Sequence, residues 1–378
     1  MNLVKVEGTP KPKVLLVFGT RPEAIKMAPV VKELQRRGDE VVSRVCVTAQ
    51  HREMLDDVLE LFGLYPDYDL DIMSEDQSAS QVAAVVMARL APVLGAEQPD
   101  WVLLQGDTTT VAAAALAAYY GRIKVGHVEA GLRTLDKWQP FPEEINRRVA
   151  SAVADLHFAP TERARTNLLR EGVSSALIVV SGNPVIDALQ WAAEQPFELD
   201  AGPLANLPFG KRIILVTAHR RESFGGALQN ICSALRELAG RFGDGVHVVY
   251  PVHPNPNVRR TVYHELDGVA NITLLPPLDY LSFVQLMKRC EVILTDSGGI
   301  QEEAPSLGKP VLLLRAVTER PEAVEAGAVR VVGTEQQNIV HWTERLLRDP
   351  VEYARMARAV NPYGDGHAAK RIAEALLR

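Results

Sequence analysis

The chain has 378 residues, of which 47% are hydrophobic and 23% are charged, and its formal net charge is −6. This length exceeds one ordinary hydrophobic core and fits two domains of ~150–200 residues. The negative charge argues against an electrostatic grip on nucleic acid. The N-terminal stretch lacks a signal-peptide layout, no apolar run reaches ~18 residues, and the three cysteines lack zinc-site spacing. We therefore expect a soluble cytoplasmic protein without a bound metal or a membrane span.

Short apolar, β-branched runs alternate with longer amphipathic segments through the first half of the chain. The runs predicted as strands are 13–18, 41–48, 101–106, 123–130, 156–160 and 176–182. Their apolar residues are continuous rather than alternating, which is typical of parallel strands covered by helices on both faces.

The stretch 191–211 is rich in Pro, Gly and Ala and predicts a linker, after which the alternation restarts. The second set of predicted strands is 212–219, 245–253, 271–277, 291–296, 309–314 and 329–333. The fold class we expect is α/β, with two doubly wound, Rossmann-like domains facing each other across a cleft. The expected domains are 1–190 and 212–361, with 362–378 as a C-terminal helix that crosses back to the first.

Ligands of such sheets bind outside the carboxyl ends of the strands, so the residues that follow each strand are the candidates for a site. After the first strand, Thr20 and Glu23 have the spacing of a capping box. Arg21 and Lys26 flank the start of the same predicted helix, which favours anions. The alternative is a well-capped helix that carries two solvated bases.

Acidic residues follow three other segments of the first half. Asp107 ends one apolar strand, Glu129 ends the next with His127 two residues earlier, and Glu143 lies with Glu144 in a predicted first helical turn. Each could simply cap a helix or complement its dipole. If the three converge on one site they suit general acid or base work, and metal binding is the competing interpretation, with less support from the spacing.

In the second half, His219 ends a strand beside two arginines, and His253 lies in a Pro-bounded turn that we interpret first as loop structure. A histidine at a strand end in a basic turn is a candidate to meet a phosphate or to donate a proton.

The turn at 295–303, TDSGGIQEE, follows the next apolar strand. Ser297, Gly298 and Gly299 would present donors to an anion at a helix start, and Glu303 would lie one helical turn later. This arrangement suits a nucleotide, with the diphosphate on the amides and the ribose diol on Glu303. The GxGxxG fingerprint of NAD enzymes is absent after the first strand, so no redox cofactor is indicated.

The strand-end motifs together resemble the bacterial non-hydrolysing UDP-N-acetylglucosamine 2-epimerases, in the same order from about residue 14 to about 375. The motifs that carry this resemblance are FGTRPEAIKMAPV, QHREML, GDTTT, HVEAGLRT, PFPEEINRR, SGNPVID, TAHRRESFG, TDSGGIQEEAPSLGKP, TERPE and NPYGDGHAA. The resemblance implies the two-domain glycosyltransferase-B fold, interconversion of UDP-GlcNAc and UDP-ManNAc without a cofactor, and a homodimer.

The resemblance also implies roles for residues at matching positions. Its catalytic residues match Asp107, Glu129, Glu143 and His219. Those that hold the UDP-sugar match Arg21, Lys26, Phe283, Ser297, Gly298, Gly299, Glu303 and Arg320. Gln50 and His51 match a second UDP-GlcNAc site at which the substrate activates the enzyme, and the hydrolysing relatives lack that motif.

The implied reaction eliminates UDP to give 2-acetamidoglucal and then adds UDP back with inversion at C2. It needs a base, an acid on the opposite face, donors for the departing diphosphate, and closure of the domains about 191–211 and 361–366. Three alternatives remain: a hydrolysing epimerase that releases ManNAc, a glycosyltransferase of the same fold, and a non-catalytic UDP-sugar sensor.

Overall fold

The computed structural model describes residues 10–49, 52–74 and 77–378. The chain divides into two compact units, one formed by Met1–Ala188 with Gly366–Arg378 and the other by Leu189–Asp365. The expected linker 191–211 belongs to the second unit. There it comprises the end of α7 (Pro184–Glu194), the short 3-10 helix η2 (Gly202–Leu204) and the chain around them.

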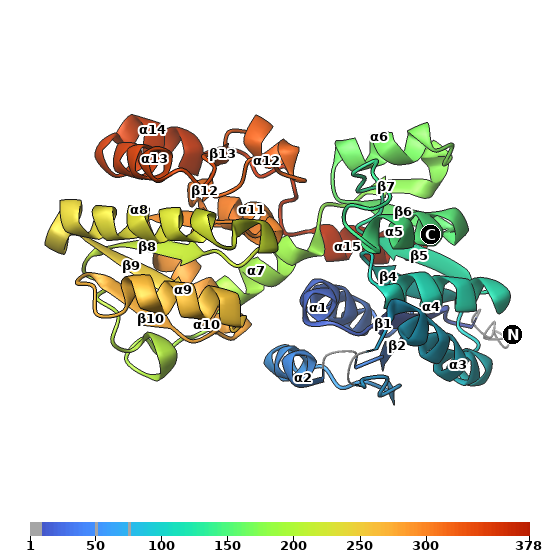
Figure 1. Ribbon diagram of the computed structural model, residues 1–378. Helices are drawn as coiled ribbons and strands as arrows, with labels where there is room; N and C mark the ends of the chain where they lie inside the picture. The colour runs from blue at the N-terminus through green and yellow to red at the C-terminus, as the bar shows by residue number, and fades with distance from the viewer. Residues whose placement is uncertain (1–9, 50–51, 75–76) are drawn as a thin grey trace, which may run out of the picture. The chain divides into compact units, whose positions relative to one another are not determined.

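The first unit is built on a seven-stranded sheet with the order β3-β2-β1-β4-β5-β6-β7, in which every pairing is parallel (Figure 1). Its strands are β1 (Lys13–Phe18), β2 (Val42–Val47), β3 (Tyr68–Asp69), β4 (Trp101–Gln105), β5 (Lys124–Val128), β6 (Leu156–Ala159) and β7 (Ile178–Val180). The six predicted strands of this half are confirmed, and β3 was missed because it has only two residues, one of them charged.

Helices connect these parallel strands. They are α1 (Arg21–Arg36), α2 (Arg52–Leu61), α3 (Ala79–Glu97), α4 (Thr109–Tyr120), α5 (Glu143–Val153), α6 (Glu162–Arg170), η1 (Ser175–Leu177) and α7. Val14, Leu15, Leu16 and Val17 of β1 are all fully buried, so the sheet is covered on both faces, as the continuous apolar pattern predicts.

The second unit contains a six-stranded parallel sheet with the order β10-β9-β8-β11-β12-β13. Its strands are β8 (Arg212–Thr217), β9 (Val246–Pro251), β10 (Ile272–Leu275), β11 (Val292–Thr295), β12 (Val311–Leu313) and β13 (Val329–Val331). All six were predicted. The expectation of two doubly wound α/β domains is therefore confirmed.

The helices of the second unit pack around a core of apolar side chains from β8, β9, β11 and α8. They are α8 (Gly226–Phe242), α9 (Pro256–Leu266), α10 (Tyr280–Arg289), α11 (Gly298–Glu303), α12 (Pro321–Glu325), α13 (Gln336–Arg348) and α14 (Pro350–Ala357). Three more 3-10 helices complete it: η3 (Arg221–Ser223), η4 (Gly243–Gly245) and η5 (Ala304–Leu307).

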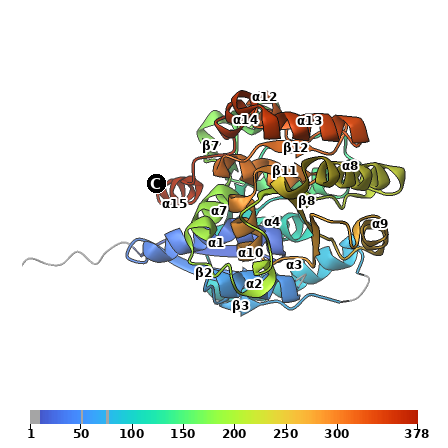
Figure 2. The same cartoon turned by 90° about the vertical axis from the view of Figure 1, so that its left-hand side faces the viewer.

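The C-terminal helix α15 (Ala368–Leu376) belongs to the first unit, where it lies beside α1 (Figures 1 and 2). The carboxylate of Asp187, on α7, accepts hydrogen bonds from the backbone N–H groups of Ala368 (3.2 Å) and Ala369 (2.9 Å). Two of the orphan donors at the start of α15 are thereby satisfied, which fixes the last segment of the chain to the first unit.

Helix α3 is, within the described residues, the one helix long and apolar enough to cross a membrane by length and composition. Its inward face contributes Val82, Val86 and Leu90 to the first core, where it packs against α4 (Figure 1). A core helix of a globular domain passes the same test. The outward face of α3 is largely exposed.

Candidate active site

The order of strands reverses at one place in each sheet, between β1 and β4 in the first unit and between β8 and β11 in the second. Chain segments that leave the carboxyl ends of these strands diverge there, which leaves room for a ligand. The predicted site residues Arg21, Asp107, His219 and Ser297 all lie directly after these four strands.

Asp107 follows β4 after Gly106, whose positive φ of 83° makes the turn. Thr108, not Asp107, is the N-cap of α4, because its hydroxyl accepts from the backbone N–H of Val111. The Asp107 carboxylate instead forms an ion pair with Arg147. The backbone carbonyl oxygen of Asp107 accepts a hydrogen bond from Asn146 Nδ2 at 3.0 Å. The interpretation of Asp107 as a simple helix cap is therefore wrong.

Glu129 lies just after β5 with a backbone φ of +65°, in the left-handed region that costs energy for a residue with a side chain. Its Oε2 atom accepts from Lys26 Nζ, from Gln105 Nε2 (2.9 Å) and from Asn183 Nδ2 (3.3 Å). The side chain of Glu129 is almost wholly buried. A buried carboxylate in a strained backbone with three donors on one oxygen is held in a fixed position, as acid–base chemistry requires.

His127 connects the ends of β4 and β5. Burial lowers its pKa to about 4, so the ring is neutral near pH 7. Its Nε2 lies 2.7 Å from the carbonyl oxygen of Gly106, which can only accept, so Nε2 carries the proton. The ring thus supports the turn that precedes Asp107.

The two adjacent glutamates at the start of α5 have different surroundings. Glu144 is fully buried and pairs with Arg147 (3.3 Å) and Arg148 (2.8 Å), and it accepts from the backbone N–H of Thr134. Glu143 has a buried Oε2 atom with no hydrogen-bond partner among the described residues. Glu144 therefore has a structural role, while Glu143 keeps an acceptor available to a ligand.

Contacts within the first unit fix Asp107 and Glu129. Arg147, one helical turn after Glu143 on α5, holds Asp107, and Gln105, two residues before Asp107, donates to Glu129. Lys26, expected to hold the UDP-sugar, pairs with Glu129 instead of facing solvent. Arg21 is the first residue of α1 and is half-buried. Sequence reasoning missed Arg147, although its i, i+4 spacing from Glu143 was visible.

In the second unit, His219 leaves β8 beside Asp296, which leaves β11. The imidazole Nδ1 lies 3.7 Å from Asp296 Oδ1, and the ring stacks on His253 with centroids 4.9 Å apart. Burial lowers the pKa of His219, and the Asp296 charge opposes that change. The first interpretation of His253 as loop structure left out this contact, which depends on the tertiary fold.

The Ser297–Gly299 turn begins α11, with Ser297 as its N-cap. A Cβ atom on Gly298 would lie 3.2 Å from Glu319 Oε1, and one on Gly299 would lie 3.5 Å from Glu303 Oε1. Glu303 therefore points back at the turn, as its spacing predicts, and accepts from the Tyr280 hydroxyl at 3.2 Å.

The other predicted residues of this half surround the same turn or lie on α10. Arg320 pairs with the buried Glu302, and Phe283 is half-buried on α10. Arg220 pairs with Glu319 at 3.0 Å, so a basic group that sequence reasoning left unassigned lies next to the Gly298 backbone.

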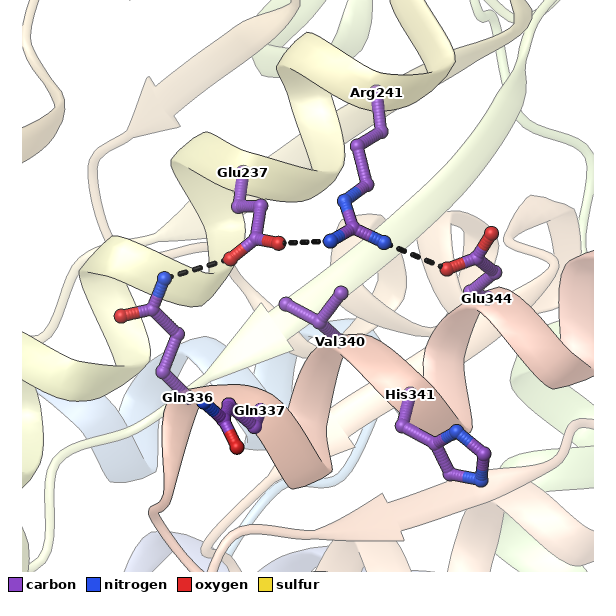
Figure 3. Close-up of a pocket in the computed structure, with 7 residues that line it drawn as sticks. All are labelled: Glu237, Arg241, Gln336, Gln337, Val340, His341 and Glu344. Atoms are coloured by element: carbon purple, nitrogen blue, oxygen red, sulfur yellow. Dashed lines mark hydrogen bonds and ion pairs between the residues drawn. The ribbon is translucent and has the colours of Figure 1, made fainter.

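One surface groove lies apart from these strand ends. A surface groove of about 430 Å³ between α8 and α13 is crossed by Arg241, which bridges Glu237 (2.5 Å) and Glu344 (3.0 Å) (Figure 3). This network joins two helices and includes none of the predicted site residues.

Gln50 and His51, predicted to line a second UDP-GlcNAc site, fall outside the described residues. The described part of the chain contains no cluster of three or more metal-ligating side chains.

Comparison with known proteins identifies the family of the chain. Residues 32–377 match the family described as UDP-N-acetylglucosamine 2-epimerase. The chain is 55% identical over 370 residues to the UDP-N-acetylglucosamine 2-epimerase of Escherichia coli K12, covering 96% of this chain and 98% of that protein. The protein of the same description from Yersinia pestis is 56% identical over 370 residues, with the same coverage.

Solved structures give the same result. The Neisseria meningitidis UDP-GlcNAc 2-epimerase bound to UDP-GlcNAc superposes with a TM-score of 0.87 at 51% identity, covering 97% of this chain and 99% of that one. The Methanocaldococcus jannaschii enzyme in complex with UDP-GlcNAc and UDP superposes with a TM-score of 0.79 at 33% identity, covering 96% and 99%. With acids at the strand ends of one unit and a histidine and a glycine turn at those of the other, the chain belongs to the UDP-N-acetylglucosamine 2-epimerase family and is an isomerase.

Proposed function

We propose that this protein is a non-hydrolysing UDP-N-acetylglucosamine 2-epimerase, which interconverts UDP-GlcNAc and UDP-ManNAc. The observation that carries the proposal is the contrast among its acids. Asp107 and Glu129 are each fixed by a cation, whereas Glu143 has a buried oxygen without a hydrogen-bond partner among the described residues. Three candidate acids at the strand ends and helix start of one unit exceed what sugar transfer or simple binding requires.

The chemistry explains why several acids are needed. A base takes the proton from C2, the C2–H electrons form a C1=C2 double bond, and the C1–O electrons leave with UDP, which gives 2-acetamidoglucal. UDP then adds back at C1 while a proton is delivered to the opposite face of C2. One group must accept a proton and another must donate one. Asp107, Glu129 and Glu143 supply these groups.

The second unit supplies the groups for the nucleotide. In the proposal, the Ser297–Gly299 turn and His219 donate to the diphosphate as charge develops on it, with Arg21 of the first unit and Arg320 as further cations. Glu303, which points back at the turn, accepts from the ribose hydroxyls, and Phe283 lies against uracil. Lys26 serves the UDP-sugar while holding Glu129. The solved relatives bound to UDP-GlcNAc or UDP support this choice of ligand.

The non-hydrolysing branch is supported by QHREML, the motif that contains Gln50 and His51, for which we keep the proposed second UDP-GlcNAc site. The cytoplasm remains the proposed location, since Cys46, Cys232 and Cys290 are buried free thiols. No cofactor enters the proposed reaction.

We also propose a homodimer, with α3 in the interface. Ala84, Ala88 and Ala91 are exposed on this apolar helix, and Tyr119 (58% exposed) and Tyr120 (68%) end the neighbouring α4. A second copy of the chain would cover this surface and remove its apolar area from water.

Product analysis tests the reaction. The purified protein is incubated with UDP-GlcNAc, and the mixture is separated by anion-exchange chromatography. The expected result is formation of UDP-ManNAc, with an amount of free UDP far below the amount of UDP-ManNAc. Accumulation of free ManNAc with one equivalent of UDP would move the protein to the hydrolysing branch. Unchanged UDP-GlcNAc would refute both.

A further inference from the structure

Asp296 is the most completely buried charged residue near the proposed diphosphate site. It follows β11 directly and its side chain has no exposed surface. Moving a carboxylate out of water is costly unless hydrogen bonds or opposite charges compensate. The contacts of its two oxygens therefore show what the residue is placed there to do.

One oxygen is fully used. Asp296 Oδ2 accepts from the backbone N–H groups of His219 and Arg220, both at 2.8 Å, and from Ser223 Oγ at 3.1 Å. These three donors belong to the turn that follows β8 and leads into η3. The oxygen thus fixes the backbone that carries His219 to the end of β11.

The other oxygen is buried and has no hydrogen-bond partner among the described residues. His219 Nδ1 lies 3.7 Å from it, just beyond hydrogen-bond distance, and would form an ion pair with it on a protonated ring. A small rotation of the imidazole, which is only about one-third exposed, would bring Nδ1–H onto this oxygen.

The ring that stacks on His219 is that of His253, with centroids 4.9 Å apart. His253 Nδ1 accepts from the backbone N–H of Asn255 at 3.1 Å, so that nitrogen is unprotonated. The titratable or charged groups around His219 are then Asp296 from the β11 turn, His253 from the turn after β9, and Arg220, which is itself paired with Glu319. Asp296 is the only one of these that stabilises a positive charge on the ring.

We propose that Asp296 is a positioning residue for His219: one carboxylate oxygen fixes the His219 backbone, and the other holds the imidazole with its proton on Nδ1. Nε2 is then the nitrogen that faces a ligand, and on the charged ring it donates to the departing diphosphate. This inference rests on the proposed function for its catalytic consequence, although the pairing itself concerns only this chain.

The variant Asp296→Asn tests the pairing. An amide oxygen can replace Oδ2 and keep the three hydrogen bonds, while the NH₂ group takes the place of Oδ1 and turns a donor toward His219. We expect the neutral ring to change from the Nδ1–H to the Nε2–H tautomer and the pKa of His219 to fall further. Nitrogen-15 NMR of histidine-labelled, ligand-free protein measures both, with the signal assigned by His219→Asn.

Ser223→Ala is the matched control, because it removes a donor to the same carboxylate without changing its charge. It should leave the tautomer of His219 unchanged. If Asp296→Asn left both tautomer and pKa as they are, or if Ser223→Ala changed them equally, the proposal would be overturned.

Activity gives the second measurement. Asp296→Asn should lower kcat for epimerisation about 10²-fold, and the loss should shrink as the pH is lowered, because protonation of His219 is then restored. A uniform loss at all pH values would indicate a merely structural role. If the NMR changes occur but the wild-type protein does not epimerise UDP-GlcNAc, the proposed function fails while the pairing stands.

Discussion

The Asp107 carboxylate forms an ion pair with Arg147, and the same guanidinium contacts Glu144 Oε2 at 3.3 Å. Arg147 lies four residues after Glu143 on α5, so it joins the turn after β4 to the helix that carries a second proposed acid. The geometry of Asp107 is therefore set by the first turns of α5 as well as by its own strand.

Asp107→Asn and Glu129→Gln should each lower turnover of UDP-GlcNAc by about 10²-fold or more, because each removes a group from the proposed proton transfers. Initial rates from product chromatography measure the loss. Circular dichroism of each variant confirms that it is folded. Near-normal rates in both folded variants would refute the assignment of the acids.

The adjacent residues Glu143 and Glu144 offer a matched comparison of function and stability. Glu143→Gln should lower turnover about 10²-fold or more and shift the thermal midpoint by no more than about 2 °C, since no partner of its buried oxygen is lost. Glu144→Gln removes the charge of a fully buried carboxylate that pairs with Arg147 and Arg148, and it should lower the midpoint by about 6–12 °C. Differential scanning calorimetry and initial rates distinguish the two, and the reverse pattern would exchange their roles.

Stability should decrease as the pH falls from about 6.5 towards 4, because burial lowers the pKa of both His127 and His157 to about 4 from the ordinary 6.5. In this range the unfolded chain binds protons that the folded chain does not, so the free energy of unfolding falls with the pH. Each histidine contributes at most about 3 kcal/mol. Urea unfolding at pH 7 and pH 5 measures the change.

The variant His157→Gln provides the control for this pH dependence. Its free energy of unfolding should differ less between pH 7 and pH 5 than that of the wild type, since one of the two groups no longer titrates. An equal pH dependence in the variant would show that other groups are responsible.

A charge on the exposed face of α3 should separate the proposed dimer. Ala88→Glu is expected to give the monomer mass, near 41.5 kDa, by size exclusion with light scattering, because it places a charge within an apolar interface. Asn338→Glu, on the exposed face of α13, should leave the wild-type mass unchanged. A monomeric wild type, or a dimeric Ala88→Glu, would contradict the proposed interface.

The sequence predicts the architecture well because long apolar runs such as Lys13–Phe18 can be buried only within a parallel sheet covered on both faces. The prediction that Glu143 and Glu144 lie in a first helical turn also agrees, since α5 begins at Glu143. The two-residue strand β3 was missed because a pair such as Tyr68–Asp69 has no period from which it could be recognised.

The sequence indicates which residues are candidates for the site, but it does not indicate which side chains they contact. Strand-end spacing identifies Asp107, Glu129 and His219, yet the partners Arg147, Lys26 and Asp296 meet them only through the fold. The role of Thr108 as N-cap shows the same limit, since Asp107 and Thr108 are both good caps and only the backbone decides between them.

Proton NMR of the purified protein with UDP-GlcNAc in D₂O follows the C2–H bond itself and so reports on proton transfer at this carbon. We expect UDP-ManNAc to appear and the C2 proton signal of both sugars to be lost as deuterium enters from solvent. Formation of UDP-ManNAc with the C2 proton retained would contradict proton transfer by Asp107, Glu129 and Glu143, and with it the elimination mechanism.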